Sequence, residues 1–229
     1  EKVNREVPFN GLRFIIDHAE TVSPSNIERI RALGGGIAIQ HRMAFQGEYF
    51  VARYGKEAAR HTPPIKAMLA QGVPVGAGTD ATRVASYNPW VALYWLVTGK
   101  TLGGLALYGD DNLLDRNTAL YLWTKGSSWF SGEQERKGAL RPGEYADLAV
   151  LSDDYFAVET EQIVVAAVAV QLVEGGVARD VVVAVAALGV LDRDALRDRD
   201  VLRQAADVGE RSRTEIDALV LEVAGKVER

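Results

Sequence analysis

The sequence contains no cysteine, which excludes disulfide bonds and thiolate metal sites. Any metal ion that this chain binds must therefore be held by histidine, aspartate or glutamate. Histidine is itself scarce, because only His18, His41 and His61 occur among the 229 residues. Each histidine can accordingly be assessed as a separate candidate ligand.

Clusters of positive charge and long apolar segments are also missing. The chain has 26 Lys and Arg against 31 Asp and Glu, a formal net charge of −5, and its basic residues lie among acidic ones. Proteins that bind nucleic acids usually present a basic face, so we expect no nucleic-acid partner. The longest apolar run, 181–190, is too short to cross a bilayer, and the first residues lack the apolar stretch of a signal peptide. We expect no membrane partner and a cytoplasmic location.

The chain does contain a repeated pattern. An apolar run ends at a polar residue, a Ser, Thr or Asn followed by Pro begins a helix, and a Gly ends that helix. Short apolar strands that alternate with capped helices predict βα units and a parallel sheet. The apolar runs are 12–16, 36–41 and 73–80, the helix starts are Ser23-Pro24, Thr62-Pro63 and Asn88-Pro89, and the helix ends are Gly34, Gly72 and Gly99.

Three potential metal ligands, His18, His41 and Asp80, come at the ends of these apolar runs. In a (β/α)8 barrel the chemistry takes place at the carboxyl ends of the strands, so we expect the three side chains at one edge of the sheet. Pro74 is expected at the very start of its strand, because proline cannot donate to the strand ladder. The long interval between His41 and Asp80 leaves room for an extra strand near residues 49–51.

Three stretches of the sequence carry a resemblance to a known family: IIDHAETVSPSNIERIRALGGGIAIQHRMAFQGEYF, TPPIKAMLAQGVPVGAGTDATRVASYNPW and KGALRPGEYADLAVLS. The chain resembles the amidohydrolase superfamily, and most closely the amidohydrolase family 3 branch, which includes N-substituted formamide deformylase and D-aminoacylase-like enzymes. The resemblance covers about residues 1–156. In the third stretch, Pro142-Gly143 suits a type II turn and residues 148–151 suit a buried strand.

The resemblance implies an α/β fold class, namely the C-terminal portion of a (β/α)8 TIM-type metal-dependent hydrolase barrel plus part of a small β-sandwich domain. The barrel part is expected at 1–137, the part of the composite sandwich at 138–178, and a divergent, helical tail at 179–229. The family's strand-one His-x-His pair is not in this chain, and the chain begins with Glu1 rather than Met. We therefore expect a missing N-terminal half of the barrel as a partner.

By the same resemblance, His18 and His41 are the strand-five and strand-six metal ligands, and Asp80 is the strand-eight aspartate. They would hold a divalent metal, expected to be zinc, and Asp80 would also be catalytic, taking a proton from the attacking water and giving it to the leaving amine. The implied reaction is hydrolysis of a non-peptide carbon–nitrogen bond in a small-molecule amide or formamide. The alternatives are a non-catalytic barrel fragment and a small-molecule binding domain without a complete metal site.

Several other residues keep two interpretations at this stage. Asp17 or Glu20 could orient His18 or could be solvated charges, and His61 could be a surface residue or part of a helix cap. A homo-oligomer is neither indicated nor excluded. Trp90, Tyr94 and Trp95 are expected in the core, and Arg42, Tyr87 and Asn88 are weak candidates for a pocket lining.

Overall fold

The computed structural model describes residues 1–81, 84–145, 147–151, 153–165 and 168–172. The chain divides into two compact units, 1–134 and 135–229, and each is described by itself. The predicted boundary between 137 and 138 stays a prediction. The predicted helical tail, 179–229, lies outside the described residues.

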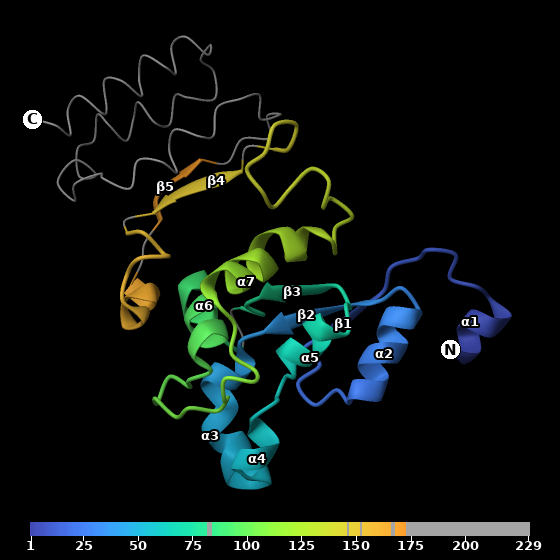
Figure 1. The fold of residues 1–229 in the computed structure, drawn as a ribbon, viewed down its shortest axis with the longest axis horizontal. Coiled ribbons are helices and arrows are strands. Elements are labelled where there is room, and N and C mark those ends of the chain that lie inside the picture. The colour runs from blue at the N-terminus through green and yellow to red at the C-terminus, as the bar shows by residue number, and fades with distance from the viewer. Residues whose placement is uncertain (82–83, 146, 152, 166–167, 173–229) are drawn as a thin grey trace, which may run out of the picture. The chain divides into compact units, whose positions relative to one another are not determined.

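The first unit is built on a three-stranded parallel sheet with the order β1-β2-β3 (Figure 1). The strands are β1 (Ile15–Asp17), β2 (Gly36–Gln40) and β3 (Val75–Gly78). The parallel sheet predicted from the sequence is therefore confirmed. Pro74 directly precedes β3, as expected, and its carbonyl accepts a hydrogen bond from the Ile37 N–H at 2.8 Å.

The predicted helix ends are largely confirmed. Helix α2 (Pro24–Ala32) has the Ser23 side chain as its cap, and α6 (Pro89–Thr98) has the Asn88 side chain, which accepts from the Trp90 N–H at 2.9 Å. Gly34, Gly72 and Gly99 all have positive φ, as glycines that follow helices commonly do. The cap and stop residues therefore define these helices from local sequence alone.

The suggested extra strand near residues 49–51 is wrong, because this segment belongs to helix α3 (Arg42–Tyr54), which is followed by α4 (Lys56–Ala59). Met43, Ala44 and Gly47 lie at helical spacing and are buried, which favours the helix over a strand. Strands β2 and β3 consequently pair with each other directly. His41 and Asp80 thus follow neighbouring strands, whereas the resemblance implied one strand between them.

The helix predicted at Thr62-Pro63 begins later, at Ile65, as α5 (Ile65–Ala70). The Thr62 hydroxyl donates to the Ala58 carbonyl at 2.6 Å and does not cap the helix. Instead, the buried side chain of Asn112 accepts from the Lys66 N–H at 3.2 Å and donates to the Pro63 carbonyl at 3.0 Å. A residue distant in the sequence therefore organises the start of α5.

Helices cover the sheet on both sides. In Figure 1, α2 and α5 lie below the strands, and α7 (Arg116–Tyr121) with the π-helix η1 (Leu122–Gly126) lies above them. Fully buried side chains come from the sheet and from α2 and α5: Ile27, Ile37, Ile39, Ile65 and Met68. On the other side, Trp129 and Phe130, which follow η1, come so close to the strands that only glycine fits at two strand positions.

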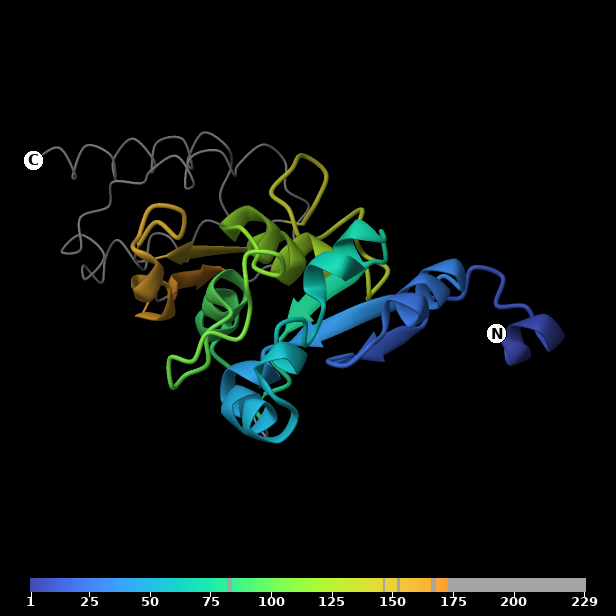
Figure 2. The same ribbon diagram turned by 60° about the horizontal axis from the view of Figure 1, so that its bottom comes forward.

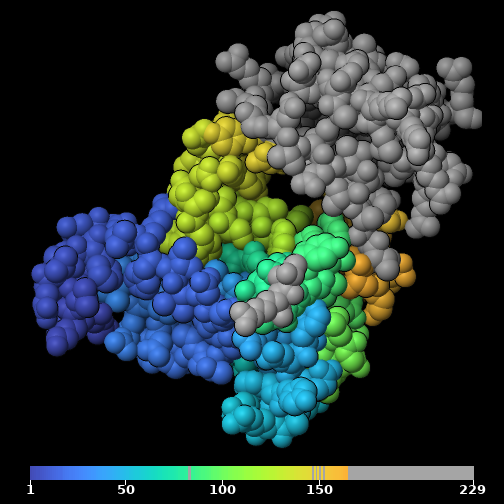
Figure 3. All heavy atoms as spheres, turned by 180° about the vertical axis from the view of Figure 1, so that it is seen from behind, coloured from blue at the N-terminus to red at the C-terminus, as the bar shows by residue number. Residues whose placement is uncertain are grey.

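Strand β1 forms an open edge of this unit. Within the described residues it pairs with β2 on one side only, and Ile15 and Ile16 are partly exposed next to the exposed Leu12. The N-terminal helix α1 (Lys2–Glu6) has no buried residue and lies at the end of the unit (Figure 2). Figure 3 shows these N-terminal residues, in blue, as one flank of the surface.

The second unit contains the antiparallel pair β4 (Leu148–Leu151) and β5 (Val168–Leu172) and the 3₁₀ helix η2 (Thr160–Val165). The predicted strand at 148–151 is confirmed, but Ala149 within it is exposed, whereas a buried strand was expected. The predicted type II turn is also confirmed, because the Glu144 N–H donates to the Arg141 carbonyl at 3.0 Å and Gly143 has a φ of 90°. In the part of the chain that the structure describes, no helix has the length and apolar character needed to cross a membrane.

We expect Gly76→Ala to destabilise the first unit, because a Cβ atom at this position would lie 2.6 Å from Phe130 Cε2 and 2.9 Å from the Ser127 Cα. The expected loss in the free energy of unfolding is about 1–3 kcal/mol, measured by urea denaturation. Gly78→Ala on the same strand is the matched control, since no atom lies within 4 Å of its Cβ position, and it should change stability by about 0.5 kcal/mol or less. Equal stability of the two variants would contradict the close approach of Phe130 to β3.

Candidate metal centre

The three predicted ligands lie at the carboxyl edge of the parallel sheet. His18 directly follows β1, His41 directly follows β2, and Asp80 comes two residues after β3. The strand register pairs Asp17 with Ala38 and Gln40 with Gly78, so all three strands end close to the same level. The parallel direction of the strands is what brings residues distant in sequence to one edge.

His18 and Asp80 come close together. The His18 Nε2 atom lies 3.7 Å from the Asp80 Oδ2 atom, although the two residues follow the outer strands of the sheet. Their side chains are 34% and 41% exposed, so the space around them is open to solvent. An imidazole nitrogen and a carboxylate oxygen at this separation can both contact one divalent cation.

The backbone at both residues is strained. His18 and Asp80 have φ values of 68° and 54°, in the left-handed region that non-glycine residues rarely adopt, and Ala19 has a φ of 53°. The Ala19 N–H donates to the Asp17 carbonyl at 2.9 Å and closes a γ-turn around His18. Strain of this kind gathers at functional sites, where the surrounding structure holds it in place.

Gln40 is a supporting residue that the sequence did not single out. The His18 N–H donates to the Ala38 carbonyl at 2.9 Å and to the Gln40 Oε1 atom at 3.0 Å. The last side chain of β2 thereby holds the turn that carries His18. The sequence could have indicated this role, because Gln40 is a polar residue that ends the apolar run directly before His41.

His41 is placed differently from the other two residues. Its side chain is 1% exposed, its ring meets Phe45 edge to face at 5.4 Å, and neither ring nitrogen has a hydrogen-bond partner within the described residues. Burial lowers the pKa of His41 to about 4, although the nearby Gly78 carbonyl favours the protonated ring. His41 is therefore a neutral imidazole at neutral pH, the form in which histidine binds metals.

The structure does not bring all three predicted ligands into one group. Among the described residues, no three His, Asp or Glu side chains are placed to hold one metal ion together. His18 and Asp80 are paired, whereas His41 lies at the same edge in a buried position. The assignment of these three residues to one metal site stays a prediction.

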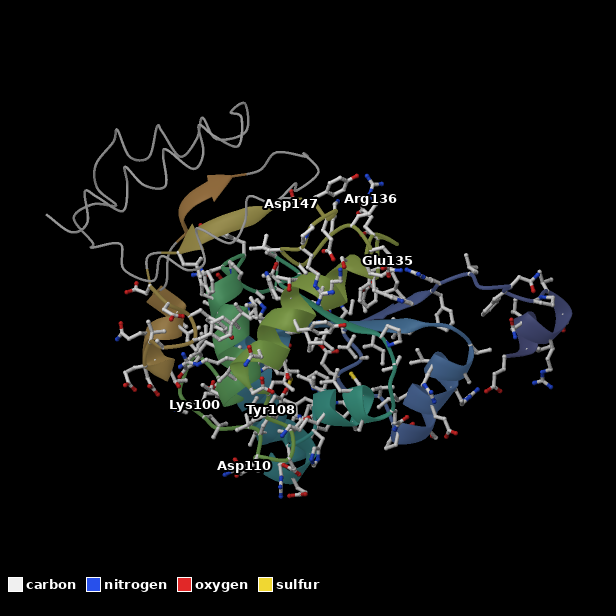
Figure 4. The ribbon with its side chains drawn as sticks, turned by 45° about the horizontal axis from the view of Figure 1, so that its top comes forward. Lys100, Tyr108, Asp110, Glu135, Arg136 and Asp147 are labelled. Atoms are coloured by element: carbon white, nitrogen blue, oxygen red, sulfur yellow. The ribbon has the colours of Figure 1, made fainter. Side chains whose placement is uncertain are left out.

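Glu20 contributes a second carboxylate next to His18. Its Oε1 atom lies 3.7 Å from the His18 Nδ1 atom, and its side chain is 22% exposed. It also lies close to Tyr108, whose pKa is raised first by burial and then by the negative charge of Glu20. The Tyr108 hydroxyl donates to the Thr62 carbonyl at 2.6 Å, and Figure 4 labels Tyr108 on the segment between α6 and α7.

The third histidine lies outside this group. His61 is about half exposed, and its Nε2 atom lies 2.8 Å from the Asp111 Oδ2 atom, which Arg60 also contacts. The hydrogen bond from His61, with help from Arg60, lowers the pKa of Asp111. The interpretation of His61 as a surface residue is therefore confirmed.

The other residues that the sequence singled out lie in the core or do not contribute to this site. Trp90 and Trp95 are buried as expected, and Tyr94 is half-buried. Asn88 caps α6, Tyr87 is exposed, and the Arg42 side chain donates to Gln46 at 3.1 Å. In the described parts of the chain, none of these last three residues forms a hydrogen bond or ion pair with His18 or Asp80.

The buried His41 predicts a pH dependence of stability in the metal-free protein. The unfolded imidazole takes up a proton at about pH 6.5 and the folded one at about pH 4, so the unfolded state binds more protons between these values. The contribution of neutral His41 to the free energy of unfolding should be complete above pH 6.5. It should be lost as the pH is lowered toward 4, which reduces the free energy of unfolding by on the order of 2–3 kcal/mol. Denaturant titrations at several pH values, in the presence of a metal chelator, measure this change in the free energy of unfolding.

His41→Phe removes the titrating ring while keeping an aromatic side chain beside Phe45, so it should lose this part of the pH dependence. His61→Gln is the control, since His61 is exposed, and it should keep the dependence of the original chain. An unchanged pH profile for His41→Phe would show that His41 does not stay neutral in the fold.

The chain is also similar to known proteins. The chain is 25% identical over 165 residues to a protein of Bacillus subtilis (strain 168) named "Putative amidohydrolase YtcJ", and the match covers 70% of this chain and 31% of that protein. It also matches the crystal structure of an uncharacterized metal-dependent hydrolase from Pyrococcus horikoshii OT3, with a TM-score of 0.57 and 24% identity. That match covers 70% of this chain and 32% of the other, and at this identity it supports the fold alone.

The chain thus spans about a third of the length of these relatives. The sequence profile of the amidohydrolase family matches residues 1–184, which is most of the 229 residues and includes His18, His41 and Asp80. The chain belongs to the amidohydrolase family.

Proposed function

We propose that this chain carries part of the metal site of a hydrolase that cleaves a non-peptide carbon–nitrogen bond in a small amide or formamide. The observation that carries the proposal is the 3.7 Å approach of His18 Nε2 to Asp80 Oδ2 at the carboxyl edge of a parallel sheet. Membership of the amidohydrolase family supports it. Within that family, we propose a relative of the N-substituted formamide deformylase and D-aminoacylase-like enzymes.

The residues at the site suit a divalent metal, and zinc is the ion we propose. Two imidazoles and a carboxylate are a donor set that zinc commonly accepts, and the chain has no thiolate to compete with them. Both ring nitrogens of His41 are buried and have no hydrogen-bond partner in the described structure. The His18 Nδ1 atom is also buried and has no such partner there. His18, His41 and Asp80 are the proposed ligands.

Asp80 is the proposed catalytic residue. A bound metal would lower the pKa of water and polarise the substrate carbonyl. The Asp80 Oδ2 atom would accept one proton from the water that adds to the carbonyl carbon, and would return it to the nitrogen as the carbon–nitrogen bond breaks. The side chain is 41% exposed, which leaves room for a small-molecule substrate, and its carboxylate lies beside His18.

The sheet suggests that further strands belong to the working protein. Strand β1 leaves one edge without a partner in the described structure, and apolar side chains at Leu12, Ile15 and Ile16 are partly exposed there. Open strand edges pair readily with other chain segments. We propose that the N-terminal half of a (β/α)8 barrel supplies those strands and that β4 and β5 belong to an accompanying small β-sandwich.

Zinc binding tests the proposed site directly. We expect this chain to bind zinc in competition with a chromophoric chelator, and His18→Asn and Asp80→Asn each to weaken the affinity by about tenfold or more. Asn tolerates the positive φ at both positions, so the backbone should be kept. His61→Gln is the matched control and should bind as the original chain does. Equal zinc affinity of Asp80→Asn and the original chain would contradict the role of Asp80 as a ligand.

Activity is expected to need more than this chain. The longer protein containing it should hydrolyse members of a panel of formamides and N-acyl amino acids, while this chain alone should be inactive, because a loosely held site loses the benefit of preorganisation. Asp80→Asn in the longer protein should lower kcat by about 10²–10⁴-fold. Comparable turnover by this chain alone would show that the additional strands are dispensable.

A further inference from the structure

His18 lies between two carboxylates. Its Nδ1 atom is 3.7 Å from Glu20 Oε1, and its Nε2 atom is 3.7 Å from Asp80 Oδ2. A neutral imidazole carries one N–H group, so it can donate a hydrogen bond to only one of the two. The other nitrogen then presents a lone pair to the remaining carboxylate.

Burial distinguishes the two sides of the ring. The His18 Nδ1 and Glu20 Oε1 atoms are both buried, and neither has a hydrogen-bond partner in the described structure. Asp80 is 41% exposed, and its carboxylate is accessible to water. Because a buried polar atom without a partner costs free energy, the single N–H group is best placed between His18 and Glu20.

Tyr108, a donor on which the charge of Glu20 acts, is already engaged elsewhere. The buried Tyr108 lies close enough for the charge of Glu20 to act on it, but its hydroxyl proton goes to the Thr62 carbonyl at 2.6 Å. A phenol has one proton to donate, so Tyr108 cannot also serve Glu20. Asp17, the other acidic neighbour of His18, is exposed at the end of β1.

We propose that Glu20 is a positioning residue that accepts a hydrogen bond from His18 Nδ1–H and so fixes the Nε2 lone pair toward Asp80. Shortening the present separation by about 0.9 Å would give a normal charge-assisted hydrogen bond. Both buried atoms would gain a partner in the same step. The inference deepens the proposed function and rests on it, because the fixed lone pair is the one that a metal shared with Asp80 would need.

The tautomer of His18 in the metal-free chain tests this without activity or metal. Nitrogen-15 NMR of the imidazoles at pH 8, with the His18 signals assigned by their loss in His18→Gln, should show the proton on Nδ1. Glu20→Ala should move it toward Nε2, the preferred position in free histidine. Glu20→Gln keeps an acceptor oxygen and should retain the Nδ1–H form, and Asp17→Asn should have no effect.

A proton on Nε2 of His18 in the original chain would overturn the proposal. This measurement does not depend on whether the Glu20 variants fold. An unchanged tautomer in Glu20→Ala would overturn it as well.

Zinc affinity gives a second readout that separates the two proposals. Glu20→Ala should weaken zinc binding by about 10–100-fold, Glu20→Gln should weaken it less, and Asp17→Asn should leave it unchanged. If the original chain binds no zinc, the proposed metal site fails, while the tautomer still decides the role of Glu20. If the original chain and Glu20→Ala bind zinc equally, Glu20 has no positioning role and the metal site stands.

Discussion

The parallel pairing of β1, β2 and β3 is the constraint on which the candidate site depends. Parallel strands end at one edge, so residues that follow them meet there even when many residues separate them in the sequence. The direct pairing of β2 with β3 then allows His18 and Asp80 to approach each other across the end of β2. A strand inserted between β2 and β3 would move Asp80 away by one strand spacing.

Much of this sheet could be predicted from the sequence because its determinants are local. The apolar runs, the Ser23 and Asn88 caps and the glycines after the helices each act within a few residues. The helix α3 was missed because Tyr49, Phe50 and Val51 favour strands by type, whereas the burial of Met43 and Gly47 against the rest of the unit decides the helix.

At the site, the sequence identified residues but not their arrangement. His18 and Asp80 were predicted at one edge, and they lie there. The sequence could not choose between Asp17 and Glu20 as the neighbour of the His18 ring, because the choice depends on the positive φ values at His18 and Ala19, which reverse the chain locally. Gln40 was missed for the same reason, since its role depends on the position of this turn.

The cap that Asn112 supplies to α5 has a consequence for folding on the ribosome. Helix α5 has six residues, which is too short to be stable alone, and its first turn depends on a side chain that is synthesised more than forty residues later. The same amide also donates to the carbonyls of Arg60 and Pro63, so the whole segment before α5 lacks its anchor until that point. The cap of α5 can therefore form only after β3, α6 and the segment up to Asn112 have all been synthesised.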